Sequence, residues 1–488
     1  MLKWFNILLG PVLAIVCYYA MQSGEADESI AYMAAVAAWM AVWWITEAVP
    51  LAVTSLLPIC LYPVFGIMST KAIAPSYMND VLFLFVGGFI MAFAMEKWNL
   101  HKRIALKIIL LIGSDINKIL LGLMSASFIL SMWISNTATT MMMIPTTLAV
   151  INKLEEFDKA KSKKLSVGLL LGIAYAASIG GTATLVGTPP NLIFLSHFAA
   201  TFPDKTPISF LQWFMFGFPV ALVFLFIAYQ LLRKIYTSKL SNASNNIEIF
   251  KTEYRQLGKT GFEEKMVMLL FSIMALLWFS RADLEIGALH IPGWSNLFAH
   301  PEYFQDGTVA IAMAIILFLI PSKQKKGKML MDWASVKKLP YNIILLFGGG
   351  FALAKGFTQS GLTEWLSGRL DFIGHLPTVL VVVAVCLFMT FITEITSNMA
   401  TTQLVLPVFA AIAIGSGINP LLLMIPATFS ASFAFMLPVA TAPNTIIFGS
   451  EKITIKDMAY TGLFLNLIGV ALISISMLIY GNWVFSVD

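Results

Sequence analysis

The sequence predicts an all-α polytopic membrane protein with an inverted-topology repeat, in which about eleven transmembrane helices accompany two re-entrant hairpins and two broken helices. Three observations lead to this prediction. The composition is that of a chain embedded in a lipid bilayer, the same motifs occur in the same order in both halves, and positive charge gathers in the loops on one side of the membrane.

The composition excludes a soluble globular domain. Hydrophobic residues make up 58% of the 488 residues, charged residues only 12%, and the mean hydropathy is +0.82. Apolar runs long enough to cross a bilayer recur along the chain and are continuous, whereas the strands of a membrane barrel alternate apolar and polar residues. We therefore expect a multi-pass helical protein of the cell membrane.

Apolar runs between basic loops give eleven expected crossings. The first run, 5–21, is similar to a signal peptide, but the many runs behind it favour a retained helix. A basic amphipathic segment, "KWNLHKRIALKII" at 97–109, is expected to lie along the membrane interface. The crossings are expected near 5–21, 30–49, 51–67, 81–96, 165–200, 210–232, 264–280, 306–321, 342–358, 420–450 and 458–480.

Two further apolar segments are expected to enter the membrane and turn back. The segment 119–151 is too long for one helix of about 20 residues. Basic loops flank both of its ends, so we expect both ends on the same face, with Ser135 at the turn. The segment 377–415 is centred on Thr396, but its flanks carry little positive charge. The first hairpin is therefore predicted on the inner side and the second on the outer side.

This topology places 26 of the 31 lysines and arginines on the cytoplasmic side. So strong a bias supports a cytoplasmic N-terminus and a C-terminus outside the cell. The net charge of +5 thus reports orientation and does not indicate a nucleic-acid partner.

The two halves of the chain carry matching motifs. The segments "SNTATT" at 135–140 and "SNMATT" at 397–402 lie 262 residues apart, as do "LFVGGFIMA" at 84–92 and "LFGGGFALA" at 346–354. Because one constant offset joins both matches, we infer a duplication. Since the two hairpins enter from opposite faces, the repeats are related by an axis in the membrane plane, as in many secondary transporters. The predicted regions are a first repeat at 1–232, a cytoplasmic amphipathic linker at 233–263 and a second repeat at 264–488.

A further pair of motifs interrupts one apolar span in each half. The segment "GGTATLVGTPPN" at 180–191 contains glycines and two prolines, and its partner "MLPVATAPN" at 436–444 contains Pro438 and Pro443. Proline stops a helix but is well tolerated at the first position of a new one. We expect each span to break into two half-helices around an unwound loop, and a simple proline kink is the alternative.

Unwound backbone at mid-membrane persists only where protein surrounds it or where it lines a cavity. The two Ser-Asn turns and the two broken spans present four helix starts, whose unpaired N–H groups and partial positive charge suit an anion. Hydroxyl, amide and carbonyl oxygens without carboxylates suit a small monovalent cation. Helix capping by Ser and Asn is the alternative interpretation of the turns. The side-chain oxygen donors are Ser131, Ser135, Asn136, Thr393, Ser397 and Asn398.

No lysine or arginine lies in the spans near these turns. An anion would therefore be neutralised by helix dipoles, amides and co-bound cations, which is a reason to expect coupled transport. Glu47, Glu96 and Glu394 are the acidic residues closest to the membrane core. Glu47 and Glu96 fall at span ends, where they can cap or pair, and Glu394 is either structural or a proton relay.

With these motifs in this order, the chain resembles the divalent anion:sodium symporter family, whose members carry Krebs-cycle dicarboxylates, citrate or sulfate. The motifs "SNTATT", "SNMATT", "GTPPN" and "TAPN" carry the resemblance, which covers nearly the whole chain. It implies a homodimeric secondary transporter for a small anionic substrate and sodium. It also implies an elevator motion of a transport domain past a fixed scaffold, with connecting arms after residues 96 and 358.

The family's binding residues carry over to the positions that match its motifs. One sodium site would use Ser131, Ser135, Asn136 and the region of Gly187. The other would use Thr393, Ser397, Asn398 and the region of Ala440. The substrate would contact Ser135, Asn136, Thr137, Thr188, Pro189, Ser397, Asn398 and Thr441. Sodium would be the coupling ion, and the resemblance implies no other cofactor.

Two residues depart from the family pattern. Met399 stands where the pattern has Thr, and Ala442 replaces the first Pro of the second Pro-Pro-Asn. Both leave the identity of the substrate open. We expect sodium-driven uptake of a C4 dicarboxylate such as succinate, fumarate or malate. Citrate, sulfate or sodium-independent dicarboxylate exchange are the alternatives.

An enzyme and an anion channel are the competing classes of function. A membrane enzyme needs a nucleophile, a base or a metal cluster. The five histidines lie at span ends or in loops, and the three cysteines lie in apolar segments without partners at metal-ligand spacing. We therefore expect no enzyme activity. A channel would use similar helix starts but needs no cation ligands.

Overall fold

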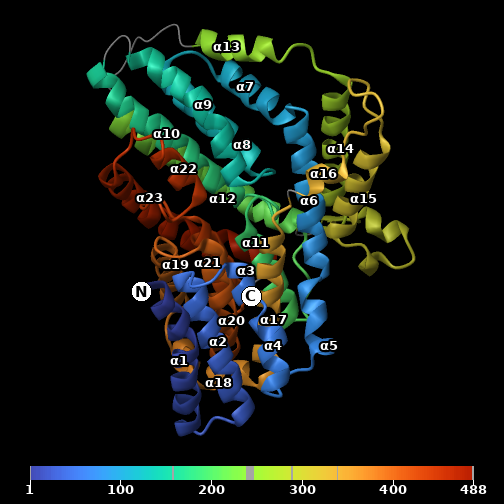
Figure 1. The fold of residues 1–488 in the computed structure, drawn as a ribbon, viewed down its shortest axis with the longest axis vertical. Coiled ribbons are helices and arrows are strands. Elements are labelled where there is room, and N and C mark those ends of the chain that lie inside the picture. Colours follow the sequence, from blue (N-terminus) through green and yellow to red (C-terminus); the bar gives the residue numbers. More distant parts are fainter. Residues whose placement is uncertain (1, 156–158, 238–246, 287–288, 338, 486–488) are drawn as a thin grey trace.

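The computed structural model describes residues 2–155, 159–237, 247–286, 289–337 and 339–485. These residues form a bundle of helices with one short β-hairpin (Figure 1). Within them, eight helices are long and apolar enough to cross a membrane, and further apolar helices are shorter. The predicted class of helical membrane protein is confirmed. The number of eleven crossings stays a prediction.

The first half of the chain runs to the end of α12. The amphipathic segment predicted at 97–109 is α7 (Leu100–Ile112), which follows α6 (Asp80–Lys97) directly. The other elements of this half are α1 (Leu2–Ser23), α2 (Glu28–Thr46), α3 (Leu51–Thr54), α4 (Leu57–Val64), α5 (Thr70–Ile73), η1 (Ala74–Tyr77), α8 (Ile116–Ser131), α9 (Asn136–Glu155), α10 (Lys159–Gly181), α11 (Pro189–Thr201) and α12 (Phe210–Leu232).

The linker predicted at 233–263 begins with a π-helical turn, η2 (Arg233–Thr237), and contains α13 (Ile247–Gln256), which packs on α7 and α9. Residues 238–246 of this prediction lie outside the described residues. After the linker, α14 (Phe262–Phe279) and α15 (Asp306–Leu319) flank a β-hairpin of β1 (Leu284–Ile286) and β2 (Leu289–Ile291), which the sequence did not predict.

The second half continues with α17 (Tyr341–Ser360), which carries the second glycine-rich motif. The remaining elements are η3 (Trp294–Leu297), η4 (Pro301–Tyr303), α16 (Trp333–Val336), α18 (Leu362–Arg369), η5 (Asp371–His375), α19 (Thr378–Ile392), α20 (Asn398–Ser416), α21 (Leu421–Ser432), α22 (Ala442–Phe448), α23 (Ile455–Ser476), η6 (Met477–Gly481) and α24 (Asn482–Phe485).

The span predicted at 51–67 corresponds to one apolar helical segment, Leu51–Val64, with a short interruption between α3 and α4. The hydroxyl of Tyr77 donates to the carbonyl oxygen of Ser55 at 2.5 Å, so this carbonyl is bonded outside any helix. A proline at the start of α4 then begins a new helix, as prolines do at first helical positions. The partner of Ser55 comes from beyond the segment, where local sequence patterns give no information about it.

At both predicted hairpins the structure has two helices joined by a non-helical turn, and their re-entry into the membrane stays a prediction. α8 and α9 are separated by the non-helical residues 132–135, and α19 and α20 by 393–397. In the view of Figure 1, α8 and α9 lie above α11, whereas α20 lies below it. The two hairpins therefore approach the same region of the molecule from opposite directions.

Both predicted breaks are also present. Residues 182–188 separate α10 from α11, and residues 433–441 separate α21 from α22. A proline stands at the first or second position of each new half-helix. A simple kink is excluded, because each interruption leaves at least seven residues outside the two helices.

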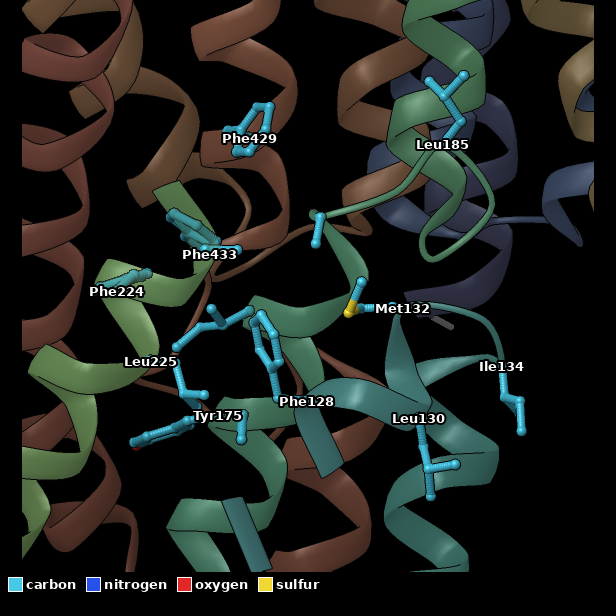
Figure 2. Packing of buried hydrophobic residues seen from close by; sticks show 14 of the residues in the cluster. Phe128, Leu130, Met132, Ile134, Tyr175, Leu185, Phe224, Leu225, Phe429 and Phe433 are labelled. Carbon is cyan, nitrogen blue, oxygen red and sulfur yellow. The ribbon is translucent and has the colours of Figure 1, made fainter. Parts of the chain in front are cut away.

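The main core includes residues of the first turn and of both broken-span loops. Figure 2 shows Met132 of the first turn, Tyr175 of α10, Phe224 of α12 and Phe433 of the second break among its side chains. The rings of Phe224 and Phe433 lie 4.7 Å apart between centroids. The hydroxyl of Tyr175 donates to the carbonyl oxygen of Phe435 at 2.8 Å. The first hairpin and both broken spans are thus packed into one body.

A second, smaller core joins α2, α4 and α17. Trp44 and Tyr62 are fully buried in it, and the hydroxyl of Tyr62 donates to the carbonyl oxygen of Ala352 at 3.1 Å. This core packs α2 against α17. The C-terminal end of α2 and the N-terminal end of α17 both lie at the candidate site.

Candidate functional site

One cavity of about 780 Å³ lies where the two hairpin turns and the two broken-span loops meet. Its wall includes every residue predicted to contact substrate, namely Ser135, Asn136, Thr137, Thr188, Pro189, Ser397, Asn398 and Thr441. Gly187 and Ala440 of the predicted sodium sites line it as well. Ser131 and Thr393 do not line it and are fully buried at the helix ends before the turns. The roles of these residues in binding stay predictions.

Four helices begin at this cavity: α9 at Asn136, α20 at Asn398, α11 at Pro189 and α22 at Ala442. The first N–H groups of a helix have no partner inside it, and they give its N-terminus a partial positive charge. Ser135 partly caps α9, since its hydroxyl accepts the N–H of Ala138 at 3.2 Å. The wall can therefore stabilise an anion without a lysine or an arginine.

The first hairpin gathers oxygen atoms around one hydroxyl group. The Ser131 hydroxyl is in hydrogen-bond contact with Asn136 Oδ1 and also lies 2.7 Å from the carbonyl oxygen of Ala177. A serine hydroxyl has one proton and can donate to only one of these acceptors. The three oxygen atoms share only one hydroxyl proton. A small cation bound between them would be coordinated by their remaining lone pairs.

The backbone of the first broken span comes unusually close to Asn136. A Cβ built on Gly181 would lie 2.6 Å from Asn136 Oδ1, so only glycine leaves room for this amide. At the far end of the loop, a Cβ on Gly187 would lie 2.5 Å from the carbonyl oxygen of Gly181. The loop therefore closes on itself directly beside the first turn.

Asn191 holds this loop closed from within α11. Its side-chain amide donates to the carbonyl oxygens of Gly181 at 3.2 Å and of Thr184 at 2.7 Å. The hydroxyl of Thr184 in turn donates to the carbonyl oxygen of Met132, which joins the loop to the first turn. The polar groups of the unwound backbone thus find partners in the protein, as they must within a membrane.

Asn444 does the same for the second broken span. Its side-chain amide donates to the carbonyl oxygens of Ala434 at 3.1 Å and of Leu437 at 3.0 Å. The hydroxyl of Thr441 accepts the N–H of Asn444 at 3.4 Å and caps α22. The second loop is therefore held closed in the same manner as the first.

The two turns differ in their side-chain contacts. The Thr393 hydroxyl donates to the carbonyl oxygen of Thr390 in its own helix, at 3.2 Å. Asn398 Oδ1 is buried and has no hydrogen-bond partner within the described part of the chain. The contact between Ser131 and Asn136 thus has no counterpart between Thr393 and Asn398. The second turn instead contains a pair of hydroxyls, Thr396 and Thr401, 2.6 Å apart.

Glu394 has a structural position. Its carboxylate accepts the backbone N–H groups of Phe435, Met436 and Leu437 at 2.8–3.1 Å and the side-chain amide of Asn466 at 2.6 Å. These bonds tie the second turn to the second broken-span loop. The sequence could have indicated Asn466, because an amide side chain within the apolar helix α23 needs a hydrogen-bond partner.

The cavity wall combines hydroxyl and amide groups with apolar side chains. Within the described residues, no group of three or more His, Cys, Asp and Glu side chains is placed to hold a metal ion. Met399 and Ala442, the two departures from the family pattern, both line the cavity and add apolar surface to it. Three aromatic rings of α6, those of Phe85, Phe89 and Phe93, also line the cavity.

Comparisons with known proteins cover nearly the whole chain. Residues 3–487 match the family described as the sodium:sulfate symporter transmembrane region. The sodium-dependent dicarboxylate transporter SdcS of Staphylococcus saprophyticus is 40% identical over 475 residues, which are 96% of this chain and 89% of that protein. The protein of the same name from Staphylococcus aureus is 42% identical with the same coverage of both chains.

Two solved structures have a similar fold. MtrF of Neisseria gonorrhoeae, described as illuminating a class of antimetabolite efflux pumps, gives a TM-score of 0.55 at 15% identity and covers 83% of each chain. The YdaH transporter of Alcanivorax borkumensis gives a TM-score of 0.54 at 12% identity, over 83% of this chain and 86% of that one. At such low identity these likenesses show the fold alone.

Proposed function

Because the chain belongs to the sodium:sulfate symporter family, we propose that it takes up C4 dicarboxylates such as succinate, fumarate and malate by coupling their entry to sodium. A dicarboxylate is favoured over sulfate because the relatives at 40% and 42% identity are named sodium-dependent dicarboxylate transporters. The family and these relatives are transporters, so the chain is a membrane transporter and not an enzyme.

The observation that carries this proposal is the shared cavity of the two hairpin turns. Asn136 and Asn398, which lie 262 residues apart in the sequence, line the same cavity together with both broken-span loops. A dicarboxylate has two anionic ends, and the cavity has a helix start at each turn. We assign substrate contacts to Ser135, Asn136, Thr137, Thr188, Pro189, Ser397, Asn398 and Thr441.

The coupling ion is assigned to the oxygens around each turn. The first sodium site consists of Ser131, Ser135, Asn136 and the backbone near Gly187, and the contact of the Ser131 hydroxyl with two acceptor oxygens supports it. The second consists of Thr393, Ser397, Asn398 and the backbone near Ala440, and the unpartnered Oδ1 of Asn398 supports it. Sodium bound there would neutralise the charge of the dianion. Binding of each ligand would therefore strengthen binding of the other.

We place the N-terminus in the cytoplasm and the C-terminus outside. The charge bias determines which side is inner, and contacts between distant loops support the grouping of loops into two sides, because they join segments that the charge pattern assigns to the same side. Lys97 pairs with Asp332 at 2.6 Å and Lys452 with Glu155 at 2.7 Å, all on the predicted inner side. Lys355, on the predicted outer side, donates to the carbonyl oxygen of Ala72 at 2.8 Å.

We infer that the structure represents an inward-facing state. The cavity reaches Glu47 at the end of α2 and Pro340 at the start of α17. Both positions adjoin the predicted cytoplasmic side, since Pro340 directly follows the basic loop that contains Lys323 and Lys337. Substrate that leaves the turns along this path would enter the cytoplasm.

Transport would proceed by an elevator motion of the hairpins and broken spans past α2, α6 and α17. The inverted repeat supports this proposal, because exchanging the conformations of two related halves yields the opposite access state. The helices α7 and α18, which adjoin α6 and α17 in sequence, would be the connecting arms. The chain would act as a homodimer, as the resemblance to the symporter family implies.

Uptake of labelled succinate into proteoliposomes tests this function. We expect uptake that requires an inward sodium gradient and that is abolished in Asn136→Ala and in Asn398→Ala. Asn482→Ala, which changes an exposed asparagine in α24, is the matched control and should transport normally. Normal transport in both cavity variants would refute the assigned site. Full rates in choline buffer would instead favour the sodium-independent exchanger.

A further inference from the structure

A cavity that serves an anion has one charged side chain in its wall, and that side chain is negative. Among the described residues that line the cavity, only Glu47 carries a formal charge. Glu47 is exposed and makes no hydrogen bond or ion pair within the described part of the chain. Its carboxylate is therefore free to act on ions in the cavity.

The backbone fixes Glu47 at this place. It is the residue after α2 and adopts the left-handed conformation, with φ 46° and ψ 37°, which glutamate rarely adopts. The neighbouring residues hold it there: Trp44 is fully buried, and its indole N–H donates across the turn to the carbonyl oxygen of Leu51 at 3.1 Å. Ala48 is also buried, at 2% exposure. The carboxylate thus projects from a rigid part of the molecule.

Glu47 lines the cavity from outside the hairpins and the broken spans. It directly follows α2, whose core is shared with α17 and with Ala400 of α20, whereas the turns themselves belong to the hairpins. In the elevator motion proposed above, the hairpins carry the substrate away from α2. The carboxylate would then face the substrate only when the cavity opens toward the cytoplasm.

The charge of Glu47 affects substrate binding from the two sides of the membrane differently. A fixed negative charge at the mouth of a cavity lowers the local concentration of a dianion and raises that of a monovalent cation. The repulsion energy between this charge and a divalent anion is twice that of a monovalent anion at the same distance from the carboxylate. A cytoplasmic dicarboxylate would therefore re-enter the cavity with difficulty, whereas a dicarboxylate that arrives from outside would not meet this charge.

We propose that Glu47 is a specificity-determining residue that weakens binding of dianionic substrate from the cytoplasmic side and so makes the carrier kinetically asymmetric in favour of uptake. This inference rests on the dicarboxylate transport and the orientation proposed above. Glu47 changes the apparent affinity on one face. It leaves the final concentration ratio unchanged, because the sodium and substrate gradients set that ratio.

The test compares Glu47→Gln with the unmodified protein in proteoliposomes of known orientation. The KM for succinate is measured separately on each face at saturating sodium, so that changes in sodium binding do not enter. We expect the cytoplasmic-face KM to fall about two- to fivefold in the variant, and the outer-face KM to stay the same. Choline chloride at high concentration should shrink the difference, because salt screens an exposed charge.

Three further variants separate charge from structure. Glu47→Asp keeps the charge and should retain the original cytoplasmic-face KM. Glu47→Asn removes the charge with a residue that tolerates the left-handed conformation, and it should behave like Glu47→Gln. Glu28→Gln neutralises an exposed carboxylate at the other end of α2 and should change neither KM.

The outcomes distinguish this inference from the proposed function. If the unmodified protein shows sodium-dependent succinate transport but Glu47→Gln and Glu47→Asn leave the cytoplasmic-face KM unchanged, the inference fails and the proposed function stands. An equal change of KM on both faces, or a change that high salt does not reduce, would also overturn it. No succinate transport by the unmodified protein would reject both.

Discussion

Asn191 and Asn444 make the same two hydrogen bonds. Each side-chain amide donates to a carbonyl oxygen ten residues earlier and to one seven residues earlier, at 2.7–3.2 Å. Asn191 and Asn444 lie 253 residues apart in the sequence, and so do their bonding partners. Each amide oxygen is buried without a partner in the described part of the chain. The duplication thus preserved the bonds that hold an unwound loop closed.

Replacing either asparagine by alanine should damage the loop it holds. Asn191→Ala leaves two buried carbonyl oxygens without their donors, and Asn444→Ala leaves one buried and one partly buried, at a cost of about 1–3 kcal/mol per buried unsatisfied group. We expect both variants to unfold at lower temperature in detergent and to lose sodium-dependent succinate uptake. Asn482→Ala is the control on an exposed helix. Normal thermal stability and uptake in both variants would show that the loops close without these bonds.

Gly181→Ala should displace the amide of Asn136. The new Cβ would lie 2.6 Å from Asn136 Oδ1, so the amide must move away from the Ser131 hydroxyl. If Asn136 binds sodium, the sodium concentration for half-maximal uptake should rise about tenfold, which corresponds to about 1.4 kcal/mol. The matched control is Gly368→Ala in α18, where a Cβ would meet no atom within 4 Å. An unchanged sodium dependence in Gly181→Ala would contradict the first sodium site.

Glu394→Gln should destabilise the protein. The carboxylate accepts three backbone N–H groups and one side-chain amide, and glutamine replaces one acceptor oxygen by a donor that faces these donors. Hydrogen bonds to charged groups contribute about 1.5–3 kcal/mol each. We expect a lower melting temperature together with reduced uptake. A variant that melts normally but loses only the pH dependence of uptake would instead indicate a proton relay.

Acid should weaken the ion pair between Lys97 and Asp332. The hydrogen bond from Lys97, together with that from the N–H of Ser335, lowers the pKa of Asp332 to about 2. Because the pKa in the folded protein lies below the unfolded value of about 3.9, the stabilisation is present above that value. It is lost as the pH falls from about 4 to about 2.

Thermal unfolding of Asp332→Asn across this pH range tests the assignment. The unmodified protein should be the more stable of the two at neutral pH, and the difference should shrink steadily below about pH 4. Asp204→Asn, at an exposed loop position, is the control. A difference in melting temperature that stays constant down to pH 2 would show that Asp332 acts through its shape and not its charge.

The turns and breaks were predictable because local residues determine them. Ser135 and Ser397 interrupt apolar runs, and the prolines at 189 and 190 and at 438 and 443 stop one helix and begin another. Convergence of the four helix starts was predictable from the repeat, since motifs at equal offsets are expected at equivalent places. The cavity confirms that these segments lie together.

Long-range partners were not predictable. The sequence left two roles for Glu394, a structural one and a proton relay. Its bonds to residues 435–437 and to Asn466 in the folded chain give it the structural role. The expected similarity of the two turns was incomplete, because the hydroxyl of Thr393 bonds within its own helix. At the interruption between α3 and α4, the carbonyl oxygen of Ser55 is bonded by Tyr77, which lies 22 residues later in the chain. Apart from the bond of Thr393, which is local, these contacts depend on tertiary packing, which no local pattern encodes.

The central claim is that sodium and a dicarboxylate bind together in the cavity between the two turns. Equilibrium binding of succinate to the purified protein, measured by calorimetry over a series of sodium concentrations with choline as the replacement, tests it most directly. The account predicts that the Kd for succinate falls as sodium rises and that Asn136→Ala removes this dependence. A succinate Kd that is the same in sodium and in choline would contradict it.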